Sequence, residues 1–292
     1  SNAMKRKILI TGGTGMLGAY VTSALKDTDY NVIVTERNTL NLSVPEAIFS
    51  YITAEKPDVI LHFAAETDVD LCEREPARAG IYNHLATEQI AQAAKFCGAW
   101  LLYLSSSNVF GGEGKLSYNE LDIPLPMNYY GRSKLIGESS VRNACTNNHL
   151  IIRAGWMIGG GPDKDHKFVG KIIQQIKAGS TSIKAVSDRL GSITSAMQLC
   201  NFIIWAINKR HTGTLHFASS GTISRFDIAC AIGDLLNFKG DIIPVHSSVF
   251  PLSAPRPYSE GIESIYMSIL SDAPKPSLWK SDLAKYVGTF LV

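Results

Sequence analysis

Tyr130 and Lys134 are a pair of residues whose types and spacing could carry out proton transfer. On a helix, residues four positions apart share one face, and Asn128 just before the pair is a suitable N-cap. A free phenol titrates at about pH 10, and a nearby ammonium group favours its anion, so we expect Lys134 to lower the pKa of Tyr130. This would suit general acid–base catalysis. Two solvated surface residues are the alternative, because this spacing also occurs by chance.

Three glycines, Gly12, Gly15 and Gly18, follow an apolar run at 7–11 and open a helical pattern. In this context the first glycine permits a tight turn, the second lets the backbone approach a phosphate, and the third lets helix pack on strand. The helix N-terminus formed there offers free N–H groups to an anion. A purely structural glycine turn is the alternative. The expected dinucleotide-binding residues in this loop are Gly12, Thr14, Gly15, Met16, Leu17 and Gly18.

The end of the next predicted strand, 31–35, should meet the adenosine ribose of such a cofactor. Glu36 could bond a ribose hydroxyl, which would favour NAD(H), whereas Arg37 could pair with a 2′-phosphate, which would favour NADP(H). We favour NADP(H) and keep NAD(H) as the alternative. A surface ion pair between the two side chains is the non-functional interpretation.

A run of three serines, 105–107, follows the apolar segment 100–104. In an open parallel sheet, ligands bind outside the carboxyl ends of the strands, so a hydroxyl there could bond a substrate carbonyl. A serine-rich turn that merely ends a strand is the alternative.

The elements that must position these residues alternate between strand and helix. Apolar runs predict strands at 7–11, 31–35, 59–63 and 100–104. Helical patterns follow the glycine-rich turn as far as about residue 25 and cover 44–54 and 77–96. This rhythm predicts an α/β fold with a Rossmann-like, doubly wound parallel sheet. We expect residues 4–158 to form an NAD(P)-binding domain and 159–292 mostly a smaller C-terminal substrate-binding lobe. Part of 190–218, in particular 213–217, should return to the main sheet, and residues 1–3 have the composition of a tag-cleavage remnant.

Composition excludes several classes of protein. Apolar residues make up 45% of the chain and charged residues 18%, with a net charge of +2 and both signs interspersed. This balance gives no basic surface for nucleic acid or an anionic membrane, and no apolar run approaches the ~20 residues of a membrane helix. Five cysteines without paired spacing indicate reduced thiols in a cytoplasmic protein and no zinc site. A homodimer is compatible with the sequence.

The glycine loop, the serine run and the Tyr130–Lys134 pair, in this order, together resemble an extended short-chain dehydrogenase/reductase. Over nearly the whole chain the likeness is to the dTDP-4-dehydrorhamnose reductase family. The segments that carry it are 62–70, 105–112, 130–138, 153–156 and 256–257. The resemblance implies an NAD(P)-dependent oxidoreductase that reduces a keto group on a nucleotide-linked sugar.

The resemblance also implies roles for individual residues. Tyr130 would donate a proton to the reduced carbonyl, Lys134 would bind the nicotinamide ribose, and Ser106 would occupy the catalytic Ser/Thr position. The residues added to the cofactor site are Ala64 and Ala65, expected to line the groove, and Asn83, expected to support the active-site end of the sheet. The expected substrate contacts are Ser107, Asn108, Trp156 and Arg256.

The chain also departs from this family. The reductases usually have Ser-Thr-Asp-Tyr before Val-Phe, where this chain has Ser-Ser-Ser-Asn at 105–108, and this changes the groups near the sugar. A nucleotide-sugar epimerase or dehydratase is an alternative, although a dehydratase would normally have acidic residues just after Ser106. A non-catalytic, NADP-binding regulatory subunit is the second alternative function. In related GDP-fucose synthases, which use NADPH, an arginine lies much as Arg37 does, which supports the preference for NADP(H).

Overall fold

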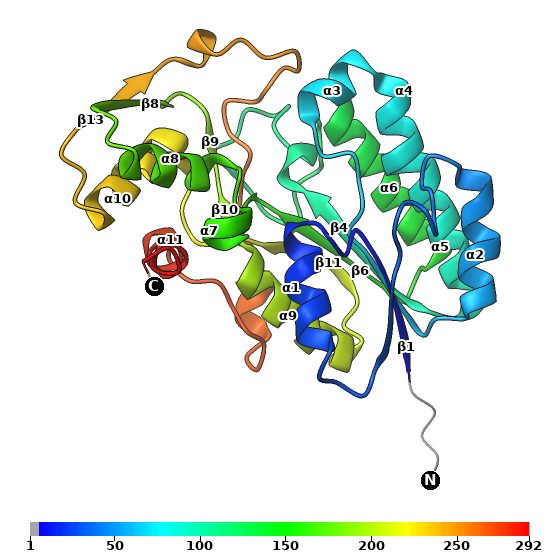
Figure 1. The fold of residues 1–292 in the computed structure, drawn as a ribbon. Coiled ribbons are helices and arrows are strands. Elements are labelled where there is room, and N and C mark those ends of the chain that lie inside the picture. Colours follow the sequence, from blue (N-terminus) through cyan, green and yellow to red (C-terminus); the bar gives the residue numbers. More distant parts are fainter. Residues whose placement is uncertain (1–5, 292) are drawn as a thin grey trace.

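The centre of the molecule is a sheet of six parallel strands, seen in a computed structural model that describes residues 6–291. The expected tag remnant, residues 1–3, lies outside the described residues. The strands run in the order β2-β1-β3-β4-β6-β11, and neighbouring strands are parallel throughout (Figure 1). Their bounds are β1 Lys7–Thr11, β2 Asn31–Val34, β3 Val59–His62, β4 Trp100–Ser106, β6 His149–Ala154 and β11 Gly213–Phe217.

Helices cover both faces of this sheet because its strands are apolar on both sides. In β1, Ile8 and Ile10 pack in one cluster with α1 (Met16–Leu25) and α9 (Ala196–Lys209). Leu9, between them, points to the opposite face and packs against the second layer of helices. That layer consists of α2 Ile48–Glu55, α5 Ala86–Cys97 and α6 Tyr129–Ala144 (Figure 1). The doubly wound parallel sheet predicted from the sequence is therefore confirmed.

The strand order creates the place for a ligand. From β1 the chain goes outward to β2 and then returns to the other side of β1 to form β3. The loops after β1 and β3 therefore diverge at the carboxyl edge of the sheet and leave a crevice between them. As expected from the sequence, 213–217 returns to this sheet, as β11 beside β6.

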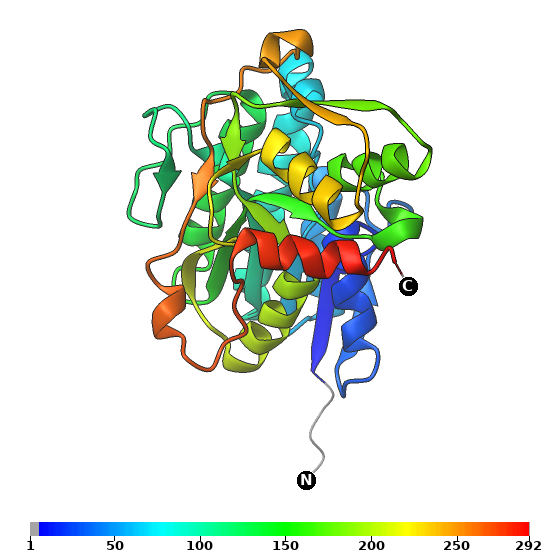
Figure 2. The ribbon, with the colours of Figure 1, turned by 90° about the vertical axis from the view of Figure 1, so that its left-hand side faces the viewer.

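The smaller lobe lies over the carboxyl edge of the sheet and has its own apolar core. Figure 2 shows α11 lying against α10 at one side of this lobe. Three two-stranded sheets, β10-β7, β12-β9 and β13-β8, complete it. Its helices are α7 Gly161–Lys164, α8 Phe168–Lys177, α10 Arg225–Leu235 and α11 Trp279–Gly288. Its strands are β7 Trp156–Ile158, β8 Ser182–Val186, β9 Leu190–Gly191, β10 Ile193–Ser195, β12 Ile223–Ser224 and β13 Asp241–Val245. One further pair of parallel strands joins β5 Ser117–Tyr118, which follows β4 in the sequence, to β14 Gly261–Ile262, which precedes α11.

The single helix predicted at 77–96 is not continuous in the structure. This segment consists of α4 (Pro76–Ala79), a π-helical turn at Gly80–Leu85 and then α5. A helix that the sequence did not predict, α3 (Val69–Arg74), precedes it. A π-turn inserts one extra residue per turn, which hydrophobic spacing does not reveal.

Among the described residues, we find no helix with the length and apolar character required to cross a bilayer.

Two glycine-to-alanine substitutions test the packing that places α1. At Gly18 a Cβ atom would clash with the carbonyl oxygen of Gly12, whereas at Gly80, which has helical φ and ψ, nothing lies within 4 Å. We expect Gly18→Ala to lower the free energy of unfolding by about 1–3 kcal/mol, because backbone must move. Gly80→Ala should leave it unchanged or raise it by up to about 1 kcal/mol. Denaturant unfolding of both variants measures this, and equal effects would contradict the close approach of α1 to the loop.

Candidate active site

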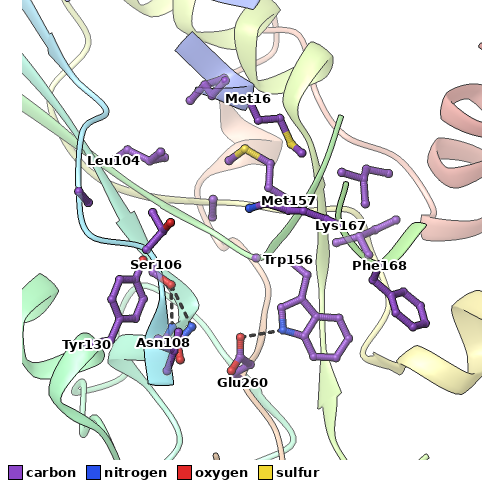
Figure 3. Close-up of a pocket in the computed structure, with 18 of the residues that line it drawn as sticks. Met16, Leu104, Ser106, Asn108, Tyr130, Trp156, Met157, Lys167, Phe168 and Glu260 are labelled. Carbon is purple, nitrogen blue, oxygen red and sulfur yellow. Dashed lines mark hydrogen bonds between the residues drawn. The ribbon is translucent and has the colours of Figure 1, made fainter. Parts of the chain in front are cut away.

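A cavity of about 720 Å³ lies between the carboxyl edge of the sheet and the smaller lobe. The sheet contributes the loop after β1, the segment after β3, the end of β4 and Tyr130 at the start of α6. The smaller lobe contributes Trp156, Phe168, Arg225 and Glu260, among others. Figure 3 shows Tyr130, Ser106 and Asn108 on one side of this cavity and Trp156 and Phe168 on the other.

The glycine loop forms the first wall of the cavity. Gly12 has a φ of +69°, and a Cβ atom there would lie 2.7 Å from the backbone nitrogen of Ala64. Gly15 is the N-cap of α1, and no side chain caps this helix, so its N-terminal N–H groups remain available to an anion. The backbone is thus shaped and polarised as a pyrophosphate site requires.

The other cofactor residues predicted from the sequence fall into two groups. The cavity is lined by Gly12, Gly15, Met16, Leu17, Gly18, Ala64 and Ala65. Thr14 is exposed and does not line it. Glu36 and Arg37 are both exposed after β2, also outside the lining, and neither has an ion-pair partner within residues 6–291. Both side chains are therefore free to meet a ribose or a phosphate that extends beyond the cavity.

Ser106 and Tyr130 come together because β4 and α6 pack side by side. The Asn128 side chain caps α6 by accepting a 2.8 Å hydrogen bond from the Gly131 N–H, which places Tyr130 in the first turn. Ser106, the last residue of β4, is half-buried and lines the same cavity. Its Oγ accepts hydrogen bonds from the backbone and side-chain nitrogens of Asn108, at 3.1 and 3.3 Å (Figure 3). A hydroxyl and a phenol thus face one another where a substrate carbonyl could lie.

The protonation of Tyr130 differs from the expectation. Burial raises its pKa to about 12, against a smaller lowering by a hydrogen bond with Ser106. The predicted lowering by Lys134 is wrong for this structure, since desolvation of the phenolate outweighs any attraction from the lysine. At neutral pH Tyr130 is consequently a phenol, the form that can donate a proton.

Lys134 lies behind this pair and does not line the cavity itself. Its Nζ donates a 2.7 Å hydrogen bond to the Leu104 carbonyl and lies 4.4 Å from the centre of the Tyr103 ring. Burial lowers its pKa to about 7, while Glu138 acts in the opposite direction. The lysine therefore has one anchored hydrogen bond and two remaining N–H groups near the end of β4.

Asn83 is fully buried in the π-turn, away from the cavity. Its Oδ1 accepts from the Glu66 N–H at 2.8 Å, and its Nδ2 donates to the Glu66 carbonyl and to Ser133 Oγ, each at 3.1 Å. All its hydrogen-bonding groups are engaged, so it ties the segment after β3 to α6 and has no group left for a cofactor.

Of the four predicted substrate contacts, three line the cavity and one does not. Asn108 and Trp156 line the cavity, whereas Ser107 is buried behind it. Arg256 lines the cavity too, but its guanidinium pairs with Asp70, with Nη1–Oδ1 and Nη2–Oδ2 distances of 2.6 and 3.2 Å. That pair ties the segment before β14 to α3.

Three charged residues near the site were missed by sequence reasoning. Glu138 is buried beneath the end of β4, where it accepts hydrogen bonds from Ser105 and Arg153. Arg225 and Glu260 line the cavity from the smaller lobe. Only Glu138 carried a usable signal, since it is one helical turn beyond Lys134. The other two lie far along the chain in segments without a motif.

Comparisons with known proteins agree with this arrangement. Residues 6–291 match the family described as RmlD substrate binding domain. The chain is 31% identical to dTDP-4-dehydrorhamnose reductase of Salmonella typhimurium over 86% of its length and 87% of that protein. It is 28% identical to the spore coat polysaccharide biosynthesis protein SpsK of Bacillus subtilis over 96% of both.

Solved structures show the same likeness. A dTDP-4-dehydrorhamnose reductase ortholog from Clostridium acetobutylicum superposes with a TM-score of 0.88 at 31% identity, over 97% of this chain and 98% of that one. The reductase of Bacillus anthracis in complex with NADP has the same TM-score at 29% identity, over 97% and 99% of the chains. The chain therefore belongs to the RmlD family, whose curated relatives include the dTDP-4-dehydrorhamnose reductases.

Proposed function

We propose that this protein reduces the keto group of a 4-keto nucleotide sugar with NADPH, as its dTDP-4-dehydrorhamnose reductase relatives do by name. One observation carries the proposal. The glycine loop, Ser106 and Tyr130, from three separate parts of the chain, line a single cavity with Lys134 directly behind. Binding alone would not require a phenol and a hydroxyl facing one another at the end of β4.

Within this site the protein positions the substrate and moves one proton. Ser106 donates a hydrogen bond to the keto oxygen and so polarises the carbonyl, and Tyr130 donates its phenolic proton to the same oxygen. Lys134 would hold the nicotinamide ribose with the N–H groups that its bond to Leu104 leaves free. The glycine loop would hold the pyrophosphate of NADPH, and the bound cofactor would supply the hydride.

The preference for NADPH is supported by the NADP complex of the Bacillus anthracis relative and by the exposed guanidinium of Arg37 after β2. We also propose a cytoplasmic location, which the state of the cysteines supports, since all five are free thiols.

The proposed reaction is tested by incubating the protein with NADPH and dTDP-4-keto-6-deoxy sugars. We expect stoichiometric loss of NADPH absorbance and a reduced sugar. A nucleotide-sugar epimerase or dehydratase would convert the sugar without net consumption of NADPH, and a regulatory NADP-binding subunit would bind the cofactor without converting any sugar. Either result would replace the proposed function.

Tyr130→Phe removes only the proposed acid. We expect single-turnover oxidation of bound NADPH to slow by roughly 10²–10⁴-fold, the usual effect of losing a general acid. The neighbouring Tyr129 is exposed, so Tyr129→Phe is a matched control that should react at the parent rate. Equal rates for Tyr130→Phe and the parent protein would remove Tyr130 from the mechanism.

Arg37→Ala tests the choice of cofactor. If Arg37 pairs with the 2′-phosphate, the dissociation constant of NADPH should rise by an amount worth about 1.5–3 kcal/mol, because a charged hydrogen-bond partner is lost. NADH binding should be unchanged. Fluorescence titration with both cofactors measures the difference, and a comparable loss for both would return the ribose contact to Glu36.

A further inference from the structure

Glu260 is a carboxylate held in the cavity wall, with 5% of its surface exposed. Its Oε1 accepts two hydrogen bonds of 2.9 Å, one from Ser107 Oγ and one from the indole nitrogen of Trp156. Figure 3 shows the bond to Trp156. Its backbone N–H donates to the Leu190 carbonyl at 3.0 Å, and β14 begins at the next residue. Position and orientation of this side chain are therefore fixed from several directions.

The second carboxylate oxygen, Oε2, is left for a ligand. It makes no hydrogen bond to any residue in 6–291, yet it is not among the fully buried atoms that lack a partner. Since Glu260 lines the cavity, this oxygen opens onto it. A carboxylate oxygen is acceptor-only, so its complement is an O–H or N–H donor.

The surroundings oppose the cost of burying this charge. Burial raises the pKa of Glu260, whereas the Ser107 hydroxyl, the Arg225 guanidinium and the Trp156 indole act to lower it. Arg225 is stacked on Trp156, 4.0 Å from the ring centre, and attracts the carboxylate without forming a salt bridge to it. Ionised acceptors make the stronger hydrogen bonds, so such a group suits selective recognition.

Glu260 reaches the end of β4 from a distant part of the chain. The Ser107 hydroxyl, just after β4, donates its hydrogen bond to Glu260 Oε1. A carboxylate from a segment some 150 residues later thus lies against this strand end. Glu260 lines the same cavity as Ser106 and Tyr130, and its charge acts to raise the pKa of Tyr130.

We propose that Glu260 is a substrate-binding residue whose Oε2 accepts a hydrogen bond from the sugar hydroxyl next to the keto carbon. This inference rests on the proposed function, because it takes a 4-keto nucleotide sugar as the ligand. It assigns Glu260 a part in selecting sugars that carry this hydroxyl. A carboxylate that only joined Ser107 to Trp156 would use Oε1 alone and would not distinguish one sugar from another.

Glu260→Gln separates these two roles. The Trp156 indole can only donate, so the amide oxygen must take the place of Oε1, where it also accepts from Ser107, and the amide NH₂ then replaces Oε2 in the cavity. The link between Ser107 and Trp156 persists while the acceptor facing the sugar is lost. We expect unchanged NADPH affinity and melting temperature. The kcat/KM for the hydroxylated 4-keto sugar should fall roughly 10- to 150-fold, the range for a hydrogen bond to a charged group.

The decisive comparison uses the same dTDP-linked 4-keto sugar with and without the neighbouring hydroxyl. The parent protein should prefer the hydroxylated sugar, and Glu260→Gln should lose most of that preference because it binds the deoxy sugar about as well as the parent does. Glu263, three residues further on, is exposed, and Glu263→Gln is the matched control that should behave as the parent protein. A Glu260→Gln variant that weakens both sugars equally, or neither, would overturn the inference.

Calorimetric titration of both sugars into the protein saturated with NADP⁺ gives the same comparison without turnover. If the parent protein does not turn the sugars over but binds the hydroxylated one more tightly through Glu260, the proposed reduction fails and the binding role stands. If turnover occurs and Glu260→Gln retains the parent's preference in both measurements, the reduction stands and the role of Glu260 is wrong.

Discussion

The active-site geometry depends on the buried ion pair between Glu138 on α6 and Arg153 on β6. Glu138 is fully buried, yet its pKa lies below the ordinary value, because the hydrogen bond and charge of Arg153 outweigh the effect of burial. The Arg153 Nη2–Glu138 Oε1 distance is 2.6 Å, and Ser105 on β4 donates to the same carboxylate. Breaking one partner of such a pair leaves an uncompensated buried charge, so the relative placement of α6, β4 and β6 is strongly constrained.

This constraint brings α6 so close to the neighbouring backbone and side chains that two of its positions have no room for a Cβ atom. A Cβ atom at Gly137 would clash with the Tyr103 hydroxyl, and one at Gly131 with the Asn108 carbonyl. The same closeness buries Lys134 and Tyr130, and burial shifts their pKa values in opposite directions, to about 7 and about 12. The packing of α6 and the protonation of these two side chains are thus set by a single interface, since desolvation disfavours the charged form of both groups.

The sequence predicted the parts of the site that are local. The glycine loop, the serine run and the Tyr130–Lys134 helix each lie within a few residues, so their chemistry and the parallel sheet between them followed from spacing. The π-turn that buries Asn83 was not predictable from periodicity, and the pKa of Tyr130 depends on burial that a sequence does not display. Arg225 and Glu260 reach the cavity only through the pairing of short strands in the smaller lobe.

The two halves of the cavity differ in how they are built, and this difference bears on specificity. The half made by the sheet consists mainly of backbone and hydroxyl groups placed by β1, β4 and α6, and it holds the residues that we propose to carry out the reduction. The half made by the smaller lobe consists of side chains such as Trp156 and Glu260, held by loops and two-stranded pairs. Substitutions there leave the sheet and its buried ion pair intact, so the selection of the sugar can change while the reaction is retained.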